Sequence, residues 1–125
     1  MNQIEVDILK WLAQEYPEYE IENIIQQLQV TEREDTGVGL ITTFKLNVRL
    51  KAQGANLDTC AYHLIGPLIK STDLSDGAET YVTIENNMIT CIEMLSRGAG
   101  SPANIHFYEL VDEDVNFVDD IYSVS

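Results

Sequence analysis

The sequence predicts an α+β fold, in which an antiparallel β-sheet of about five strands carries one or two N-terminal helices packed on one face. Three observations predict this class. Apolar residues recur with a helical period through residue 28, and the period then changes to two. Turns rich in glycine and asparagine divide the alternating part into short runs, as in antiparallel sheets. Helices come first and strands follow them, which is typical of α+β rather than α/β proteins.

Size and composition favour one domain. The chain has 125 residues, of which 45 % are hydrophobic and 22 % are charged, and this is ordinary globular usage. It contains no internal repeat and no low-complexity linker. We therefore expect a single domain over residues 1–125, with a helical part at 1–28, an antiparallel sheet at 29–111 and an acidic segment at 112–125.

The first helix is expected over residues 2–16. Its apolar positions share one face of a 3.6-residue period: Ile4, Ile8, Trp11 and Leu12. Asn2 and Glu5 have the spacing of a capping box, and Pro17 ends the helix. A second helix is expected over residues 18–28, where the apolar residues again keep a helical spacing. The pair at residues 24–25 could equally begin a strand, because both are isoleucine.

Two alternating runs, at residues 28–33 and 40–48, flank a loop with glycines at 37 and 39 and predict a hairpin. Residues 62–70 are rich in β-branched and large apolar side chains and predict the next strand. Pro67 lies inside this run and donates no backbone hydrogen bond. The run is therefore expected to be an edge strand or to contain a bulge.

The clearest hairpin is expected at residues 80–95. Its two alternating runs flank Asn86 and Asn87, and asparagine tolerates the positive φ angles of a two-residue turn. A last strand is expected over residues 105–111, with Phe107 in the core.

Metal ligation finds little support in the sequence. Cys60 and His63 have C-x-x-H spacing, but no second pair stands at zinc-site distance. The acidic residues from 112 onward begin a pattern like that of an EF-hand loop. The sixth and twelfth positions of such a loop need Gly and Glu, and they are Phe117 and Ser123 here. We expect no metal and no cofactor.

Catalytic constellations are similarly weak. Cys60 and His63 are three residues apart, and on a strand this spacing points them to opposite faces. Cys91 or a serine could meet His106 only through the fold, and nothing in the sequence selects such a pair. The glycines near residue 37 lack the continuation of a phosphate-binding loop. The sequence predicts a protein that is not an enzyme.

The N-terminal segment lacks the basic region and the apolar stretch of a secretory signal. No run approaches the ~18 apolar residues of a membrane span. Cys60 and Cys91 are interpreted as buried, reduced thiols, since a small secreted scaffold usually carries more cysteines. We expect a cytoplasmic protein with no membrane partner.

The charge balance is the unusual feature of the composition. Seven basic residues against 21 acidic ones give a net charge of −14. Such a protein repels phosphate backbones, which argues against nucleic-acid binding. The excess is uneven, because residues 1–70 hold ten acids and six bases, whereas residues 71–125 hold eleven acids and one base.

Two interpretations of this charge stay open. The acids could form a solubilising surface, or they could form a docking face for a basic partner, since complementary charge speeds encounter and selects partners. For the docking face, the expected contact residues lie toward the C-terminus: Glu109, Asp112, Glu113, Asp114, Asp119, Asp120 and Tyr122.

Three segments together carry a family resemblance. They are REDTGVGLIT at residues 33–42, IGPLI at 65–69, and the stretch from DGA at 76–78 through the asparagine turn to IEM at 92–94 and RG at 97–98. This layout resembles small bacterial proteins of toxin–immunity neighbourhoods, including immunity proteins of contact-dependent growth inhibition systems. The resemblance covers roughly the middle two-thirds of the chain and implies no catalytic residues.

The resemblance implies a function that agrees with the charge. An immunity protein binds a cognate toxin and neutralises it, and many such toxins are nucleases whose clefts are basic. We therefore expect a cytoplasmic immunity protein with a cognate protein toxin, a basic nuclease domain, as its partner. The alternative is a small-molecule-binding or regulatory α+β domain that acts as a homo-oligomer. The sequence itself predicts no oligomeric state.

Overall fold

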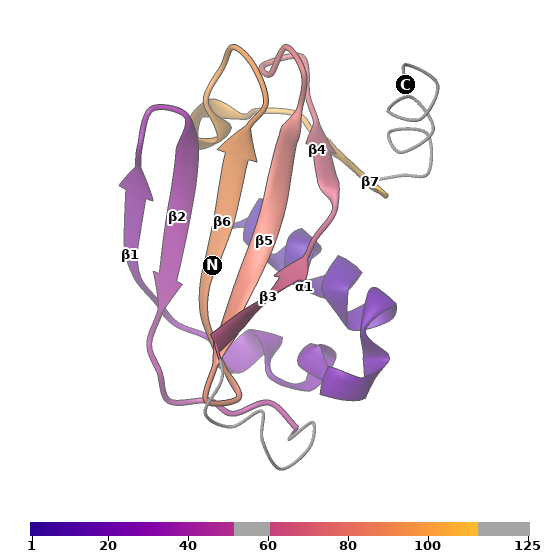
Figure 1. The fold of residues 1–125 in the computed structure, drawn as a ribbon, viewed down its shortest axis with the longest axis vertical. Coiled ribbons are helices and arrows are strands. Elements are labelled where there is room, and N and C mark those ends of the chain that lie inside the picture. Colours follow the sequence, from indigo (N-terminus) through magenta and orange to yellow (C-terminus); the bar gives the residue numbers. More distant parts are fainter. Residues whose placement is uncertain (52–60, 113–125) are drawn as a thin grey trace.

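The computed structural model describes residues 1–51 and 61–112. These residues form an α+β fold in which helical elements lie against one face of a seven-stranded sheet (Figure 1). The helical elements are α1 (Gln3–Glu15) and four 3-10 turns, η1 (Pro17–Tyr19), η2 (Ile21–Asn23), η3 (Ile25–Gln27) and η5 (Pro102–Asn104). The strands are β1 (Val30–Asp35), β2 (Gly39–Phe44), β3 (Ala61–Ile65), β4 (Leu68–Lys70), β5 (Ala78–Glu85), β6 (Met88–Ser96) and β7 (Glu109–Val111).

The sheet is antiparallel, with the strand order β1-β2-β6-β5-β4-β7, and β3 also pairs with β5. The α+β class and the N-terminal helix on one face are confirmed. The expected count of about five strands is too low. One reason lies at Gly66 and Pro67, which divide the strand expected at 62–70 into β3 and β4, two pieces that follow the same edge of β5.

The break between β3 and β4 is fixed by contacts with Thr80 of β5. The Gly66 N–H donates to the Thr80 carbonyl at 2.9 Å, and the Thr80 hydroxyl donates to the Pro67 carbonyl at 2.6 Å. A Cβ atom on Gly66 would lie 2.3 Å from the Thr80 hydroxyl oxygen. Glycine is therefore needed here for close approach to the neighbouring strand.

Helix α1 is confirmed together with its capping box. The Asn2 side chain accepts from the Glu5 N–H at 3.1 Å, and the Glu5 carboxylate accepts from the Asn2 N–H at 3.0 Å. The second helix, expected at 18–28, is wrong. Three 3-10 turns replace it, because Glu20 takes a left-handed conformation with φ of 54° and interrupts the helical path between η1 and η2.

Both expected hairpins are present. Asn86 and Asn87 join β5 to β6 with φ angles of 55° and 60°, as a two-residue turn of this kind requires. The β1–β2 hairpin turns through Gly37, whose φ is 89°. Its second strand ends at Phe44 rather than continuing to residue 48.

The core lies between α1, the 3-10 turns and the covered face of the sheet. Apolar side chains of these elements form one buried cluster, with Ile8 and Leu12 of α1 fully buried, as the helical period predicts. Ile4 and Trp11 pack against this cluster from its margin and are half-buried. Alternate positions of β5 and β6, among them Val82 and Ile92, close the core from the sheet side.

The last expected strand, at residues 105–111, is shorter than predicted. Only β7 pairs with β4, and the residues before it take another course. The His106 N–H donates to the Asp73 carboxylate at 2.9 Å, and Ser71 donates to the Phe107 carbonyl at 2.6 Å. These bonds hold the segment to the loop after β4, so the core position expected for Phe107 is wrong, and its side chain is 81 % exposed.

Candidate functional site

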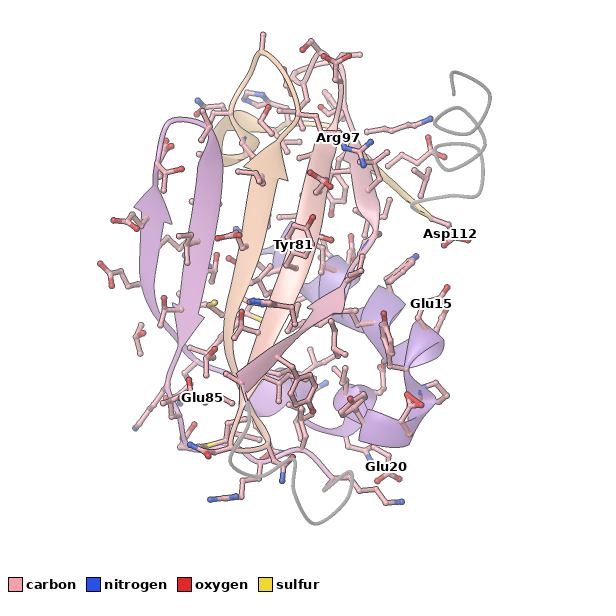
Figure 2. All side chains as sticks on the ribbon, viewed as in Figure 1. Glu15, Glu20, Tyr81, Glu85, Arg97 and Asp112 are labelled. Atoms are coloured by element: carbon pink, nitrogen blue, oxygen red, sulfur yellow. The ribbon has the colours of Figure 1, made fainter. Side chains whose placement is uncertain are left out.

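The face of the sheet turned away from α1 is the broadest candidate site. No helix of residues 1–51 and 61–112 covers it, and it faces the viewer in Figures 1 and 2. Burial alternates along β5, where Val82 and Ile84 point into the core while Tyr81 and Thr83 point outward. The outward positions of β1, β2, β3, β5 and β6 form what we call the open face.

The strand register arranges the open face into rows. One row crosses five strands in the order Glu34, Ile41, Glu93, Tyr81 and Ile65. The next row reads Glu32, Thr43, Cys91, Thr83 and His63. Figure 2 shows Tyr81 near the middle of the sheet, with Glu85 toward one end and Arg97 toward the other. The open face thus combines carboxylates, hydroxyls and half-buried apolar side chains.

Charge on the open face has one sign. Its outward strand positions hold five glutamates and no lysine or arginine: Glu32, Glu34, Glu79, Glu85 and Glu93. Arg97, from the loop after β6, reaches one of them, with 3.6 Å between its guanidinium and the Glu79 carboxylate. The Tyr81 hydroxyl donates to the same carboxylate at 3.0 Å. The open face therefore presents negative charge to a partner. The nearest outward lysine of the sheet is Lys70 on the neighbouring strand β4, where it pairs in register with Glu109 of β7.

The Glu5 carboxylate, which α1 places against the covered face of the sheet, is in a different environment. Glu5 is fully buried and accepts from the Arg33 Nε and Nη2 atoms, each at 2.8 Å, and from the Thr42 hydroxyl at 2.7 Å. Burial alone would raise the pKa of Glu5, but the hydrogen bonds from Arg33, Thr42 and the Asn2 backbone outweigh it and hold the pKa below its ordinary value. This cluster joins α1 to β1 and β2 and is structural.

Of the contact residues predicted from the sequence, Glu109 and Asp112 fall in the described part. Glu109 pairs in register with Lys70 of β4, so a basic side chain neighbours it. Asp112 is exposed and borders a shallow groove of about 370 Å³ with Trp11 and Tyr16. The other predicted contact residues lie outside the described residues: Glu113, Asp114, Asp119, Asp120 and Tyr122.

The side chains considered for catalysis are not brought together. Cys91 lies between Thr43 and Thr83 in the sheet, and it is half-buried on the open face rather than fully buried as expected. His106 is instead close to Asp73, with 3.6 Å between its Nδ1 atom and the carboxylate. Cys60 lies outside the described residues. Across residues 1–51 and 61–112, no three His, Cys, Asp or Glu side chains are grouped to hold a metal ion.

His63 has a partner of its own on the open face. Its Nδ1 atom is 2.9 Å from the Thr83 hydroxyl, one strand away. Thr83 separates it from Cys91 in the row, so the imidazole and the thiol stand two strands apart. At the strand spacing of a sheet this is about 9–10 Å, too far for proton transfer between them.

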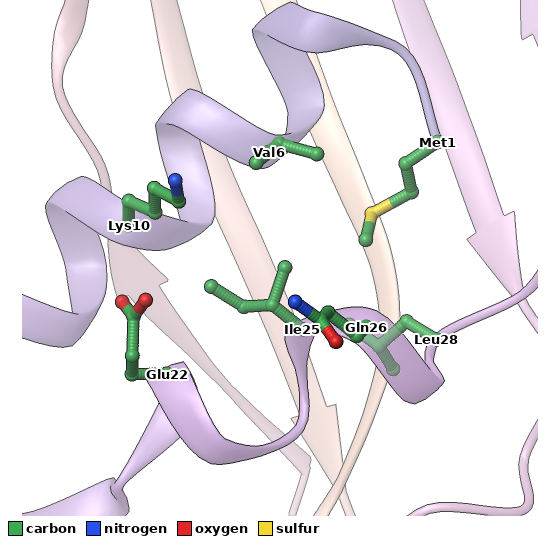
Figure 3. A pocket seen from close by; sticks show the side chains of 7 residues that line it. All are labelled: Met1, Val6, Lys10, Glu22, Ile25, Gln26 and Leu28. Carbon is green, nitrogen blue, oxygen red and sulfur yellow. The ribbon is translucent and has the colours of Figure 1, made fainter.

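A groove of about 350 Å³ lies between α1 and η3, on the helical side of the molecule (Figure 3). Lys10 and Glu22 face each other across one part of it, and the remainder is lined by four apolar side chains and one amide: Met1, Val6, Ile25, Leu28 and Gln26. It contains none of the residues expected in a small-molecule pocket, namely His63, His106 and Cys91. The groove therefore gives no support to the small-molecule alternative.

Sequence reasoning missed the open face as a site. The signal was present along single strands, since Glu79, Tyr81, Thr83 and Glu85 alternate along β5 with residues that point into the core, namely Thr80, Val82 and Ile84. What joins β5 to the glutamates of β1 and β6 is the cross-strand register, and this depends on the whole sheet.

The comparisons with known proteins add no assignment. No family model, no curated protein and no solved structure matches this chain. Within the residues described, no helix has both the length and the apolar character needed to cross a membrane.

Proposed function

We propose that this protein is an inhibitory binding protein of the immunity class, which captures and neutralises a basic bacterial toxin domain. The observation that carries the proposal is the open face, where the outward positions of β1, β2, β3, β5 and β6 hold five glutamates and no lysine or arginine. A nuclease domain is the preferred partner, because its substrate cleft must attract phosphate and is therefore positively charged.

Electrostatic complementarity supports such a role in two ways. A net charge of −14 attracts a basic partner over a distance and raises the rate of encounter. On contact, like charges exclude acidic proteins, so the same glutamates select the partner. A protective inhibitor benefits from both effects, since it must reach the toxin before the toxin reaches its substrate.

The composition of the open face also suits a protein interface. The row that runs from Glu34 to Ile65 places Ile41, Tyr81 and Ile65 among the glutamates, and Ile65 is 52 % exposed. Interfaces combine apolar and aromatic centres with polar rims, and they enrich tyrosine. A standard interface needs about 800 Å² from each partner. This is about a tenth of the 7282 Å² surface of the molecule.

The homo-oligomer alternative is disfavoured at the β1 edge of the sheet. β1 is an edge strand, and its exposed side chains include Glu32, Glu34 and Asp35. Pairing two copies of β1 would bring these carboxylates close together, and charged edge strands are a known protection against such pairing.

The direct test is a binding experiment with the toxin domain encoded beside this gene. We expect the purified protein to bind that domain and block its activity. Absence of binding would refute the proposed function.

Charge reversal then locates the surface. E34K/E93K should lower the association rate constant by about 10–100-fold at low salt and less at physiological salt. The matched control is E15K/E22K, which makes the same change in net charge at exposed positions on the helical side. Equal slowing by both pairs would mean that net charge alone acts, and it would remove the open face as the contact.

Charge reversal of Asp112, Glu113 and Asp114 tests the contact region expected from the sequence. A slower association at low salt would add this acidic segment to the interface. An unchanged rate would remove it.

A further inference from the structure

Phe107 is the most exposed large apolar side chain among the described residues. It is 81 % exposed, and the next, Val38, is 60 % exposed. A phenylalanine held in water forgoes about 2–3 kcal/mol of burial free energy. Scattered exposed apolar residues are common, so exposure alone assigns no role. The backbone around this residue provides the second observation.

The backbone around Phe107 is fixed on both sides. Ser71 donates to the Phe107 carbonyl at 2.6 Å, and the preceding N–H, that of His106, donates to the Asp73 carboxylate at 2.9 Å. The following residue, Tyr108, donates its hydroxyl to the Asp7 carboxylate of α1 at 2.5 Å. Three polar bonds thus hold a three-residue segment whose central side chain contacts water. An aromatic group presented in this way loses little conformational entropy on binding.

The surroundings of Phe107 define the chemistry of its partner. It borders a shallow surface groove of about 400 Å³ together with Lys70 and Glu109. The Asp73 carboxylate is bonded to the adjacent backbone, and the N–H of His106 keeps the pKa of Asp73 below its ordinary value, so this anion persists at neutral pH. Two carboxylates, Asp73 and Glu109, and one ammonium group, that of Lys70, therefore surround this apolar group. With two carboxylates against one ammonium group, it suits an apolar socket whose rim is mainly basic.

The Phe107 segment lies next to β4, near the end of the sheet where β5 begins. It is bonded to Ser71, which directly follows β4, and β4 pairs through Ile69 with Ala78 at the start of β5. The next residue of β5 is Glu79 of the open face. A partner that covers this end of the sheet can therefore engage both surfaces.

We propose that Phe107 is the apolar anchor of the interface, inserted into a socket of the basic toxin domain whose rim carries lysine or arginine. This inference rests on the proposed function and specifies its energetic centre. Buried aromatic anchors often dominate binding energy, while surrounding charged contacts mainly set the association rate.

The test compares F107A with L46A in kinetic binding measurements against the toxin domain encoded beside this gene. Leu46 is the matched control, because it is also a large exposed apolar side chain, 56 % exposed, and it lies just after the C-terminal end of β2. We expect F107A to dissociate at least about 30-fold faster than the wild type, the size of a typical hot spot. L46A should dissociate at the wild-type rate. F107W, which keeps an aromatic ring, should bind more tightly than F107A.

Folding and self-association are measured in parallel. F107A should keep the wild-type melting temperature, because the ring makes few contacts in the folded chain. If F107A melts lower, F107W decides: F107W at full stability that dissociates more slowly than F107A supports the anchor, and F107W at full stability that dissociates as fast as F107A refutes it. If F107A and wild type dissociate at the same rate, the anchor is refuted.

The remaining outcomes separate this inference from the proposed function. Wild-type binding that is sensitive to E34K/E93K and insensitive to F107A keeps the function and removes the anchor. Failure of the wild type to bind removes both. If F107A instead abolishes self-association in sedimentation experiments, a second copy of this chain occupies the site and the inference is wrong.

Discussion

Glutamate side chains lie in different environments on the two faces of the sheet. On the covered face, Glu5 is fully buried and accepts hydrogen bonds from Arg33, Thr42 and the Asn2 backbone. On the open face, Glu93 is half-buried and shares its row with another glutamate, Glu34. The hydrogen-bond donors to the buried Glu5 carboxylate come from the protein itself. The glutamates of the open face accumulate negative charge, and a partner can supply hydrogen-bond donors to them.

This difference separates stability from binding. A buried charge is costly unless it is fully hydrogen-bonded, so changes around Glu5 should affect folding. An exposed charge in high dielectric contributes little to folding and much to long-range attraction, so changes at Glu93 should affect association. The following predictions test the contrast, from the largest expected effect to the smallest.

Arg33→Ala should have the largest effect on stability. It leaves the Glu5 carboxylate buried without its guanidinium, and breaking a buried pair in this way costs about 3–5 kcal/mol. We expect the lower end of this range, because the Arg33 side chain is 39 % exposed and water can replace part of it. Urea unfolding measures the change. The double variant E5Q/R33A should recover part of the loss, and a single variant as stable as wild type would contradict the role of the cluster.

Thr42→Val should have the next largest effect. Valine keeps the shape of threonine and removes one donor to the Glu5 carboxylate, and a hydrogen bond to a charged group contributes about 1.5–3 kcal/mol. Thr43→Val is the control, since that neighbouring side chain points to the open face. Equal unfolding free energies for the two variants would contradict the prediction.

Acid should lower the stability of the folded chain in part through protonation of Glu5. Its pKa in the folded chain is below the ordinary value of 4.5, which holds in the unfolded chain. The unfolded state therefore binds more protons in this window, and the stabilising contribution is present above pH 4.5 and lost as the pH falls toward the folded pKa. One such group gives a slope of at most about 1.4 kcal/mol per pH unit. Urea midpoints should fall less steeply with acid for E5Q than for wild type or E93Q.

Glu93→Gln should have the smallest effect on folding. A surface substitution away from buried networks changes stability by no more than about 0.5 kcal/mol. The change removes one negative charge from a row with a second glutamate, so a small gain is the expected sign. Thermal unfolding checks it. A loss as large as that of Thr42→Val would show that Glu93 is part of a structural network.

Local signals predicted the elements that depend on local chemistry. The capping box of Asn2 and Glu5 and the positive φ angles of Asn86 and Asn87 are properties of a few adjacent residues, and the structure confirms both. The prediction of a second helix was wrong, because the spacing of its apolar residues does not reveal that Glu20 takes a left-handed conformation. Periodicity reports which face is buried, and three successive 3-10 turns can bury isoleucines at nearly the same positions as one α-helix.

Features that depend on long-range contacts escaped prediction. The pairing of Glu5 with Arg33 spans 28 residues, and nothing in the spacing of either residue reveals it. Phe107 was expected in the core as part of the strand predicted over residues 105–111, but Ser71 and Asp73 redirect its backbone. The open face required the register of five strands. In each case the missing information is tertiary.

The hydroxyl of Tyr108 has a further consequence for how the chain is completed. Its bond to Asp7 joins residues 101 positions apart, and burial together with the Asp7 carboxylate raises the pKa of Tyr108 to about 12, so the donor persists at physiological pH. Because a chain is synthesised from its N-terminal side, Asp7 is made before Tyr108. This contact can form only after the 101 positions that separate the two residues have been synthesised.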